Sequence, residues 1–422
     1  MRDRTINKPP LTLCFAIWAG TALENFDFVI YSTGAALVFS KTFFPNISFE
    51  LGILSSLGTY AVGFFARPLG GLVFSHIGDT LGRKKVLVIT LFLMGFSTFA
   101  IGLLPDFKTF GILSPSLLVF LRILQGLGSG AEQTAGMVYL SEIAPKGLAG
   151  RWTSLVFVGT TTGTFLGALL WTVVKCLSGD GLLDFAWRWV FLSSIFVTLL
   201  AFLLRLKLPE TAVFENLQKS KKICRAPIKE VFKNRLEAMF RVFFVNLGAN
   251  SVSYIVHTFF AAYMTIIGFS AEEVPQILLV SACFAIPSAY IGGIITDKIG
   301  SSNSQRILQT ASIIYLFLVF FAFNTKNILL VYIFYALGYA LVAALNSPQG
   351  VYFSQLFPTK FRYSGITLPR ELSSAIGGGL SPLIASALVF MTGSALFVSI
   401  FCSFLLLISF FATKNLGDRL GK

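Results

Sequence analysis

Twelve long apolar segments restrict the fold of this chain more than any other feature of its sequence. Each has close to, or more than, the roughly 20 residues that a helix needs to cross a bilayer. In lipid, a helix of that length satisfies all of its own backbone hydrogen bonds. The segments lie near residues 13–38, 52–75, 86–105, 116–139, 153–175, 187–205, 240–266, 274–296, 307–325, 328–353, 365–389 and 393–412. The sequence therefore predicts an all-α membrane protein with twelve transmembrane helices.

The distribution of positive charge predicts how the chain is oriented. A net charge of +14 would suggest a nucleic-acid partner in a soluble protein, but 55% of the residues are hydrophobic and only 12% are charged. If the N-terminus is cytoplasmic, most of the 33 Lys and Arg residues fall on the cytoplasmic side, and the opposite loops carry only Lys41, Lys108, Lys175, Arg188 and Lys326. This asymmetry predicts a multi-pass plasma (inner) membrane protein with both termini in the cytoplasm and without nucleic acid.

Motifs of metal sites and enzymes are missing from the sequence. The five cysteines have no metal-ligand spacing, and most of them fall within apolar segments. The chain has no HExxH motif, no nucleotide-binding loop and no soluble catalytic domain. We therefore expect neither an enzyme nor a bound cofactor.

The two halves of the chain repeat each other. Asp79 and a glycine three residues later, after the second segment, match Asp297 and the glycine three residues after it. The pattern Y-x-S-[EQ]-x-x-P follows the fourth and the tenth segments, again about half a chain length apart. The repeat predicts two six-helix bundles of parallel ancestry around a central cavity. We place the bundles at residues 1–205 and 240–422, joined by a cytoplasmic linker at residues 206–239.

The short loop after the second segment, GDTLGRKK, combines an acid with three basic residues. Asp79 lies near a helix C-terminus, where an acid is unfavourable unless a positive group is close to it. Arg83 and Lys84 are within reach. The loop can act as a latch that holds the cytoplasmic side closed, with Asp297 as its counterpart in the second half, or its charges can serve only to fix the orientation.

The first segment carries two acids on one helix face. Glu24, Asp27 and Tyr31 recur at spacings of three and four residues. Acids in a spanning helix must face a wet cavity or a cationic partner, because lipid exposure is expensive. Two interpretations remain: a cavity-lining, proton-handling face, or a structural ion pair with an arginine of a neighbouring helix.

Two arginines lie within apolar segments of the first half. Arg67 is near mid-membrane and precedes Pro68, so it can bond either the carbonyls freed by the proline or a substrate. Arg122 begins a polar stripe on the fourth segment that includes Gln125 and Glu132. A buried arginine and a buried acid on one spanning helix are hard to explain by packing alone. We interpret the stripe as functional.

The second half offers a polar face on its first helix. Asn250, Tyr254 and His257 follow one another at helical spacing in the seventh segment. A single histidine on such a face is either a hydrogen-bonded wall residue or part of a proton relay. We assign these three residues to substrate binding.

Several longer motifs resemble those of one transporter family. They are ENFDFVIY, FFARPLGGLVFSHIGDTLGRKK, RILQGLGSGAE, the passage from WRWVF to LPETAVF, and FPTKFRYSG. Over nearly its whole length the chain resembles the major facilitator superfamily, and within it the metabolite:proton symporter family, which includes proline/betaine, 2-oxoglutarate, citrate and shikimate carriers. The resemblance implies alternating access and proton coupling, with Arg122 in the coupling role and Asp79, Arg83 and Lys84 in the gating loop.

One departure from that family places charge near the expected cavity. The eleventh segment has Pro369-Arg370-Glu371 where relatives tend to have a Tyr-Asn pair. With Arg370 and Glu371 included, cations and acids around the cavity are close to balanced. That balance favours a carboxylate or a zwitterion over a bulky cation as substrate.

These observations together predict a transporter. We expect proton-coupled uptake of a small organic acid or zwitterion, in which Arg122 exchanges partners among the substrate and the acids Asp27, Glu24 and Glu132. Tyr31, Gln125, Arg67 and the polar residues of the second half complete the predicted substrate site. The partners are a small molecule and the lipid bilayer, the coupling ion is a proton, and the protein is a monomer. The alternative is a proton-coupled exporter of a siderophore, drug or metabolite.

Overall fold

The structure is a computed structural model that describes residues 11–46, 49–178, 181, 185–220, 227–269 and 273–416. Within these residues every regular element is a helix. Part of the predicted linker, residues 221–226, lies outside the described residues. The expected all-α fold is confirmed, and each of the twelve predicted segments falls on one helix or on consecutive helices.

The helices of the first half include two interrupted segments. The first predicted segment runs from α1 through a π-helix, η1, and the sixth is divided between α8 and α9. Gly82, with φ of 113°, forms the tight turn between α3 and α4. The elements are α1 (Leu11–Gly34), η1 (Ala35–Phe39), α2 (Ser40–Phe43), α3 (Phe49–Leu81), α4 (Arg83–Gly102), α5 (Phe107–Phe110), α6 (Leu113–Ile143), α7 (Ala149–Ser178), α8 (Ala186–Leu192) and α9 (Ser194–Leu206).

Two short helices of the predicted linker precede the second half. Gly300, with φ of 83°, makes the same kind of turn between α14 and α15 that Gly82 makes in the first half. The elements are α10 (Ala212–Lys219), α11 (Pro227–Asn234), α12 (Leu236–Tyr254), the π-helix η3 (Ile255–Phe259), α13 (Phe260–Ile266), α14 (Glu273–Ile299), α15 (Ser301–Asn324), α16 (Ile328–Asn346), α17 (Gln349–Leu356), the 3-10 helix η4 (Thr359–Phe361), α18 (Arg362–Thr392) and α19 (Leu396–Ala412).

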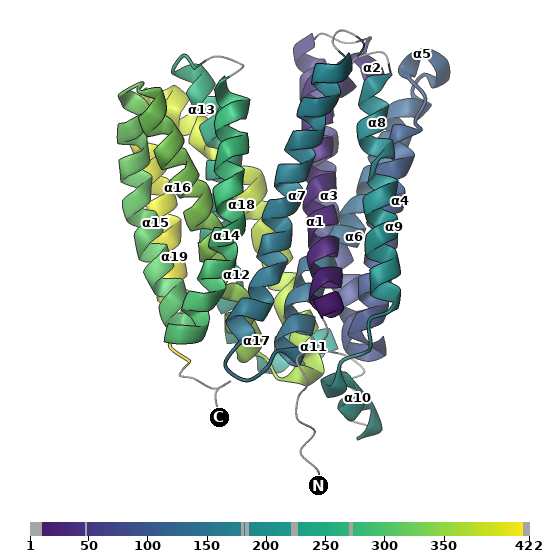
Figure 1. Cartoon of the computed structure of the whole chain (residues 1–422), viewed down its shortest axis with the longest axis vertical. Helices are drawn as coiled ribbons and strands as arrows, with labels where there is room; N and C mark the ends of the chain where they lie inside the picture. Colours follow the sequence, from purple (N-terminus) through teal and green to yellow (C-terminus); the bar gives the residue numbers. More distant parts are fainter. Residues whose placement is uncertain are drawn as a thin grey trace.

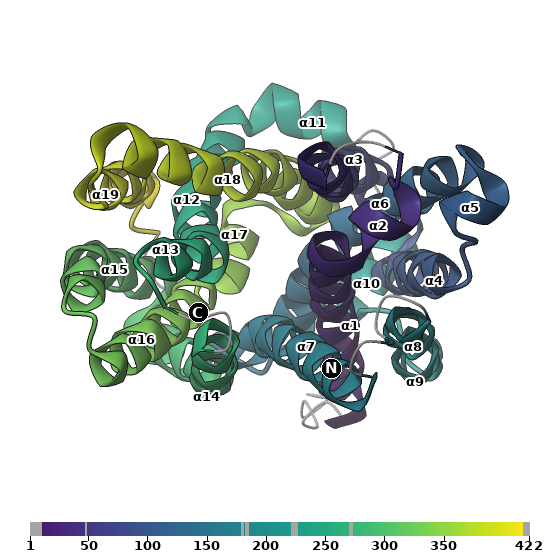
Figure 2. The same cartoon turned by 90° about the horizontal axis from the view of Figure 1, so that it is seen from above.

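The helices form two groups that stand side by side. Figure 1 shows α1 to α9 in one group and α12 to α19 in the other, and Figure 2 shows the same division from above. The groups meet along two helix pairs, α7 with α14 and α3 with α18. The first residue of α1 and the last residue of α19 lie at the same end of the molecule (Figure 1).

Glycines allow the helices of the first group to approach closely. A Cβ added at Gly163 of α7 would lie 2.0 Å from the carbonyl oxygen of Ala22 in α1. A Cβ at Gly130 of α6 would lie 2.0 Å from the carbonyl oxygen of Arg67 in α3. Larger residues would force these helices apart, so the glycine stripes set the positions of α1 and α3, which carry charged residues of the site.

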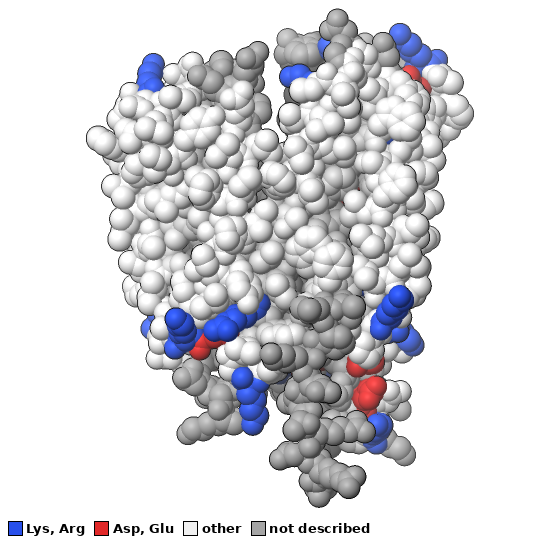
Figure 3. All heavy atoms as spheres, viewed as in Figure 1, with Lys and Arg blue, Asp and Glu red and all other residues white. Residues whose placement is uncertain are grey.

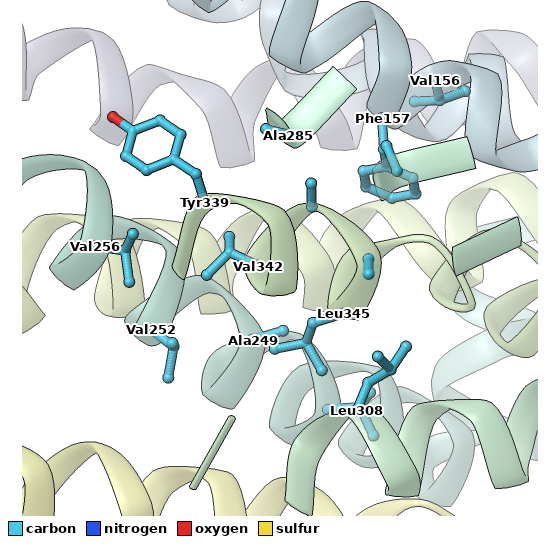
Figure 4. Close-up of a cluster of buried hydrophobic side chains, with 14 of the residues drawn as sticks. Val156, Phe157, Ala249, Val252, Val256, Ala285, Leu308, Tyr339, Val342 and Leu345 are labelled. Atoms are coloured by element: carbon cyan, nitrogen blue, oxygen red, sulfur yellow. The ribbon is translucent and has the colours of Figure 1, made fainter. Parts of the chain in front are cut away.

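Among the described residues, the buried apolar side chains form two clusters, and the surface between the two ends of the molecule is free of charge on the face drawn in Figure 3. Figure 4 shows a buried cluster in which Val252 and Val256 of α12 and its continuation lie beside Val342 of α16, with Phe157 of α7 and Ala285 of α14 close by. On the face drawn in Figure 3, Lys and Arg gather at the two ends and leave the middle uncharged. Among the described helices, nine are long and apolar enough to cross a membrane by length and composition, and Leu396–Ala412 is a shorter apolar helix.

Candidate functional site

A cavity of about 360 Å³ lies between the two groups of helices. Both groups contribute to its wall, and its volume suits a small ligand. The surface is notched between the groups at the end opposite to the start of α1 (Figure 3). The hydroxyl and amide side chains of the wall are Asn25, Ser32, Thr33, Tyr60, Gln133, Thr160, Thr161, Thr164, Asn250, Ser253, Tyr254, Thr258, Tyr339, Asn346 and Ser374.

The charged residues of the cavity wall, among the described residues, are both arginines. Arg67 comes from α3 in the first group and Arg370 from α18 in the second. His257 also lines the wall, where its ring packs edge-on against Tyr339 with ring centroids 4.4 Å apart. The wall therefore presents cations and neutral polar groups, and the carboxylates that balance these cations lie behind it.

A buried ion network closes one side of this cavity and links the two groups. Arg67 Nη2 lies 3.0 Å from Glu24 Oε1 of α1, and Arg67 Nε donates to Glu371 Oε2 of α18 at 2.8 Å. Arg370 Nη1 donates to Glu371 Oε1 at 2.8 Å, and its Nη2 donates to the side-chain oxygen of Gln133 in α6. We call Glu24, Arg67, Glu371, Arg370 and Gln133 the floor network.

The floor network is balanced in charge and almost dry. Glu24 and Glu371 are each 1% exposed, and Arg67 and Arg370 are 6% and 4% exposed. Two cations and two anions offset one another, as buried ions must if the desolvation cost is to be tolerated. Removing one member would leave its partners buried and uncompensated. The interpretation of Glu24 as the ion-pair partner of a neighbouring arginine agrees with this geometry.

A second polar cluster lies within the first group, on α1, α4 and α6. Arg122 Nη1 donates to Gln125 Oε1, and Gln125 Nε2 donates to Thr98 Oγ1 at 2.7 Å. Thr98 Oγ1 in turn donates to Asp27 Oδ2 at 2.7 Å. The chain of hydrogen bonds connects Arg122 to Asp27 without direct contact. Gly63 makes room for the arginine, because a Cβ there would lie 2.5 Å from Arg122 Nε.

Aromatic rings surround the guanidinium of Arg122. Its central carbon lies 4.2 Å from the ring centroid of Tyr31, 4.7 Å from that of Phe28 and 4.9 Å from that of Tyr60. Cation–π contacts of this kind stabilise a desolvated cation. Among the described residues, Arg122 Nε and Nη2 have no hydrogen-bond partner, and neither has Asp27 Oδ1. The arginine is thus a buried cation held without a direct carboxylate partner.

Glu132 belongs to a third cluster. Arg205 of α9 pairs with both of its carboxylate oxygens, and Thr90 Oγ1 donates to Glu132 Oε2 at 2.8 Å. Gly20 of α1 makes room for this arginine. Sequence reasoning placed Glu132 among the partners of Arg122 and missed Arg205, which lies near the end of an apolar segment and carries no spacing signal. In this structure Glu132 forms an ion pair with Arg205 and not with Arg122.

The predicted latch residues lie at the end of the molecule where α1 begins. Asp79 Oδ2 accepts a hydrogen bond from the backbone N–H of Ser364 at 2.8 Å, which joins α3 to the start of α18. Arg83 Nη2 lies 3.3 Å from Asp79 Oδ1 and 3.4 Å from Glu142 Oε1, and it donates to the carbonyl oxygen of Thr359 at 2.9 Å. The contacts with Ser364 and Thr359 cross from the first group to the second, whereas those of Arg83 with Asp79 and Glu142 lie within the first group.

Lys84 and Asp297 contribute to the same end differently. Lys84 donates its backbone N–H to Glu210 Oε2 at 3.2 Å. Asp297 at the end of α14 accepts from the backbone N–H groups of Gly150 at 2.6 Å and Arg151 at 3.2 Å, in the first turn of α7. Asp79 and Asp297 thus each bind backbone N–H groups near a helix N-terminus of the opposite group, where negative charge is favourable.

The structure divides the predicted substrate residues into two sets. Those that line the cavity are Arg67, Asn250, Tyr254, His257 and Arg370. Those that lie outside its wall are Tyr31, Gln125 and Arg122, which form the second cluster, and Glu371, which lies in the floor network. Sequence reasoning did not assign the threonines of α7 or Asn346 to the site, although they line the wall.

Comparison with known proteins identifies the family. The model of the Major Facilitator Superfamily matches residues 17–382. The inner membrane metabolite transport protein YhjE of Escherichia coli (strain K12) is 32% identical over 377 residues, covering 87% of this chain and 85% of that protein. The shikimate transporter of the same organism is 32% identical over 391 residues, covering 88% and 86%.

Solved structures agree on the fold. The proton:xylose symporter XylE, bound to 6-bromo-6-deoxy-D-glucose, superposes with a TM-score of 0.73 at 15% identity, covering 96% of this chain and 93% of that chain. The relatives are transporters, which confirms the expectation of transport and not catalysis. The resemblance seen in the sequence motifs is therefore confirmed: this chain is a multi-pass membrane transporter that belongs to the major facilitator superfamily.

Proposed function

We propose that this transporter couples the inward movement of protons to the uptake of a small organic acid or zwitterion. The observation that carries the proposal is a cavity shared by both helix groups, lined by apolar side chains together with hydroxyl and amide groups. Its charged wall residues, among those described, are Arg67 and Arg370. A separate buried pair, Asp27 and Arg122, lies outside the cavity wall and is linked through hydrogen bonds. Arg67 and Arg370 are suited to bind an anionic group of the substrate, whereas Asp27, linked to Arg122, is suited to take up a proton.

The orientation proposed from the charge asymmetry assigns this structure to the outward-facing state of the transport cycle. With both termini in the cytoplasm of a bacterial inner membrane, the contacts of Asp79, Arg83 and Asp297 close the cytoplasmic side. The notched end is then periplasmic, and the cavity faces outward. Alternating access would rock the bundles of residues 1–205 and 240–422 about the cavity, with the linker of residues 206–239 between them.

Coupling would depend on what Asp27 and Arg122 do when the proton arrives. A deprotonated Asp27 accepts from Thr98, which also accepts from Gln125, and Gln125 holds Arg122. Protonation of Asp27 removes the charge at one end of this chain of hydrogen bonds, so Arg122 loses its nearest compensation in a dry site. Rearrangement of the first group would follow, because an uncompensated buried cation is expensive.

The test is transport in proteoliposomes with an imposed inward proton gradient. Shikimate, proline and betaine are suitable first substrates, since relatives carry the names shikimate transporter and putative proline/betaine transporter. We expect accumulation of at least one organic acid or zwitterion, and its loss on addition of a protonophore. Uptake that ignores the protonophore would refute symport. Outward transport under the same gradient would support the alternative, a proton-coupled exporter.

A further inference from the structure

Glu371 holds two arginines that both face the cavity. One of its carboxylate oxygens accepts from Arg67 of the first group and the other accepts from Arg370 of the second, each at 2.8 Å. The carboxylate itself is 1% exposed and lies behind the cavity wall. A single side-chain carboxylate thus joins the two groups at the centre of the molecule.

The geometry is the one that a bound carboxylate would adopt between two guanidinium groups. Charge-assisted hydrogen bonds to both oxygens are strong and favour a planar anion. Arg370 Nε is buried and has no hydrogen-bond partner among the described residues, so this arginine retains an unused donor. An incoming carboxylate that bound Arg67 and Arg370 would leave the number of charges around them unchanged, provided that Glu371 released them.

We propose that Glu371 is an internal stand-in for the carboxylate of the substrate, and that an anionic substrate releases the floor network by taking its place between Arg67 and Arg370. This inference rests on the proposed function and narrows it. Because the described wall residues include no Asp or Glu, the ammonium group of a zwitterion would find no carboxylate there. The preferred substrate is therefore a carboxylate anion, and the hydroxyl and amide groups of the wall suit hydroxyl substituents on it.

The competing explanation is that Glu371 only neutralises the two arginines. In that case its removal would weaken the fold and raise the affinity of the two arginines for any anion, chloride included. If Glu371 instead holds the place of a substrate carboxylate, its removal weakens the fold and strengthens the binding of carboxylates selectively. The two explanations therefore predict different selectivity between carboxylates and chloride.

The first experiment is chemical rescue of the vacated position, with acetate as the probe. Glu371→Ala should lower the melting temperature of the purified protein, and millimolar acetate should restore part of the loss in a saturable manner. Chloride at the same ionic strength should restore less. Glu237→Ala is the matched control, because Glu237 is an exposed acid whose ion pair, within the described part of the chain, is with Arg241 one turn away. Equal effects of acetate and chloride on Glu371→Ala would overturn the proposal.

The second experiment uses the isosteric variant Glu371→Gln. Because glutamine keeps the side-chain volume, this variant can be tested even if Glu371→Ala fails to fold. With shikimate as the probe, a hydroxylated carboxylate, the variant should bind about tenfold more tightly than the wild type, because the internal competitor is gone. The methyl ester of shikimate lacks the anionic charge, so it should bind the wild type and Glu371→Gln with equal affinity. Binding of shikimate by Glu371→Gln that is no tighter than binding by the wild type would refute the proposal.

A charge-balanced double variant separates folding from recognition. Arg370→Gln combined with Glu371→Gln removes one charge of each sign from the floor network, so we expect it to be more stable than Glu371→Gln alone. Its affinity for acetate and shikimate should fall below that of the wild type. Failure of the proposed function has a different signature: no organic acid is taken up under a proton gradient, whereas acetate rescue of Glu371→Ala can still be observed.

Discussion

Arg67 and Arg122 are both buried arginines of the first helix group, but their surroundings are opposite. Arg67 pairs with two carboxylates, Glu24 of its own group and Glu371 of the other group. Arg122 lies among aromatic rings and donates to the amide of Gln125. One arginine is compensated and joins the two halves, whereas the other is uncompensated and stays within one half.

This contrast indicates that the two arginines have different roles. A compensated charge that crosses between the groups stabilises one conformation and must be released when the conformation changes. A buried cation whose nearest acid is reached only through a chain of hydrogen bonds becomes more costly when that acid is protonated. A rearrangement can relieve this cost, which is the property needed for coupling. We therefore expect changes at Arg67 to act mainly on stability and changes at Arg122 to act mainly on coupling.

The largest effect on stability is expected from Arg67→Gln. The substitution leaves Glu24 without its cation and Glu371 with only one, and breaking a buried ion pair from one side costs about 3–5 kcal/mol. The free energy of unfolding in mixed micelles measures this loss. Arg241→Gln is the control, because Arg241 pairs with the exposed Glu237 and donates to the carbonyl oxygen of Ala412. Exposed ion pairs contribute about 0–1 kcal/mol. Equal losses in both variants would remove the distinction between Arg67 and a surface arginine.

Arg122→Gln should show the reverse pattern. It removes a buried cation that lacks a direct carboxylate partner, so the loss of cation–π contacts should cost about 2 kcal/mol, less than the loss expected for Arg67→Gln. Proton-driven accumulation of substrate should disappear. Arg122→Lys should fail as well, since an ammonium does not reproduce the planar guanidinium among the rings. Full concentrative uptake by the lysine variant would contradict the role assigned to Arg122.

Asp27→Asn should uncouple transport while leaving the protein folded. The amide keeps an oxygen that can accept from Thr98, but it cannot gain or lose a proton in the physiological range. Counterflow, the exchange of labelled for unlabelled substrate across the membrane, should persist, and accumulation against a gradient should stop. Accumulation equal to that of the wild type would exclude Asp27 as the coupling acid and direct attention to Glu24.

The helices could be predicted from the sequence because hydrocarbon thickness fixes the length of an apolar segment. Helical spacing also placed Asn250, Tyr254 and His257 on one face, and all three line the cavity. The pairing of Glu132 was not predictable, since spacing says which residues share a face and not which helix that face meets. Arg205 reaches Glu132 only because Gly20 leaves space on α1.

The threonines of α7 that line the cavity could not be predicted from the sequence, for a related reason. Thr160, Thr161 and Thr164 each donate to a backbone carbonyl of their own helix, which is how hydroxyl residues are accommodated in any membrane helix. Nothing in the sequence distinguishes such a threonine that faces lipid from one that faces a cavity. Only the packing of α7 against α14 decides between them.

The smallest effect on transport, and the sharpest test of the comparison, is expected from a single hydroxyl. Thr98→Val deletes the link between Gln125 and Asp27, and an unsatisfied buried polar group costs about 1–3 kcal/mol. Thr90→Val is a matched control, because Thr90 lies on the same helix and donates to Glu132 at 2.8 Å. Both variants should lose similar stability when unfolding is measured.

The two threonine variants should differ in coupling. Thr98 joins the acid proposed to take the proton to the arginine proposed to respond, whereas Thr90 touches an ion pair that Arg205 completes by itself. The ratio of substrate accumulated to proton gradient imposed should therefore fall in Thr98→Val and stay near the wild-type value in Thr90→Val. Equal accumulation ratios in the two variants would mean that the coupling between Asp27 and Arg122 does not depend on this chain of hydrogen bonds, because Thr98→Val breaks that chain.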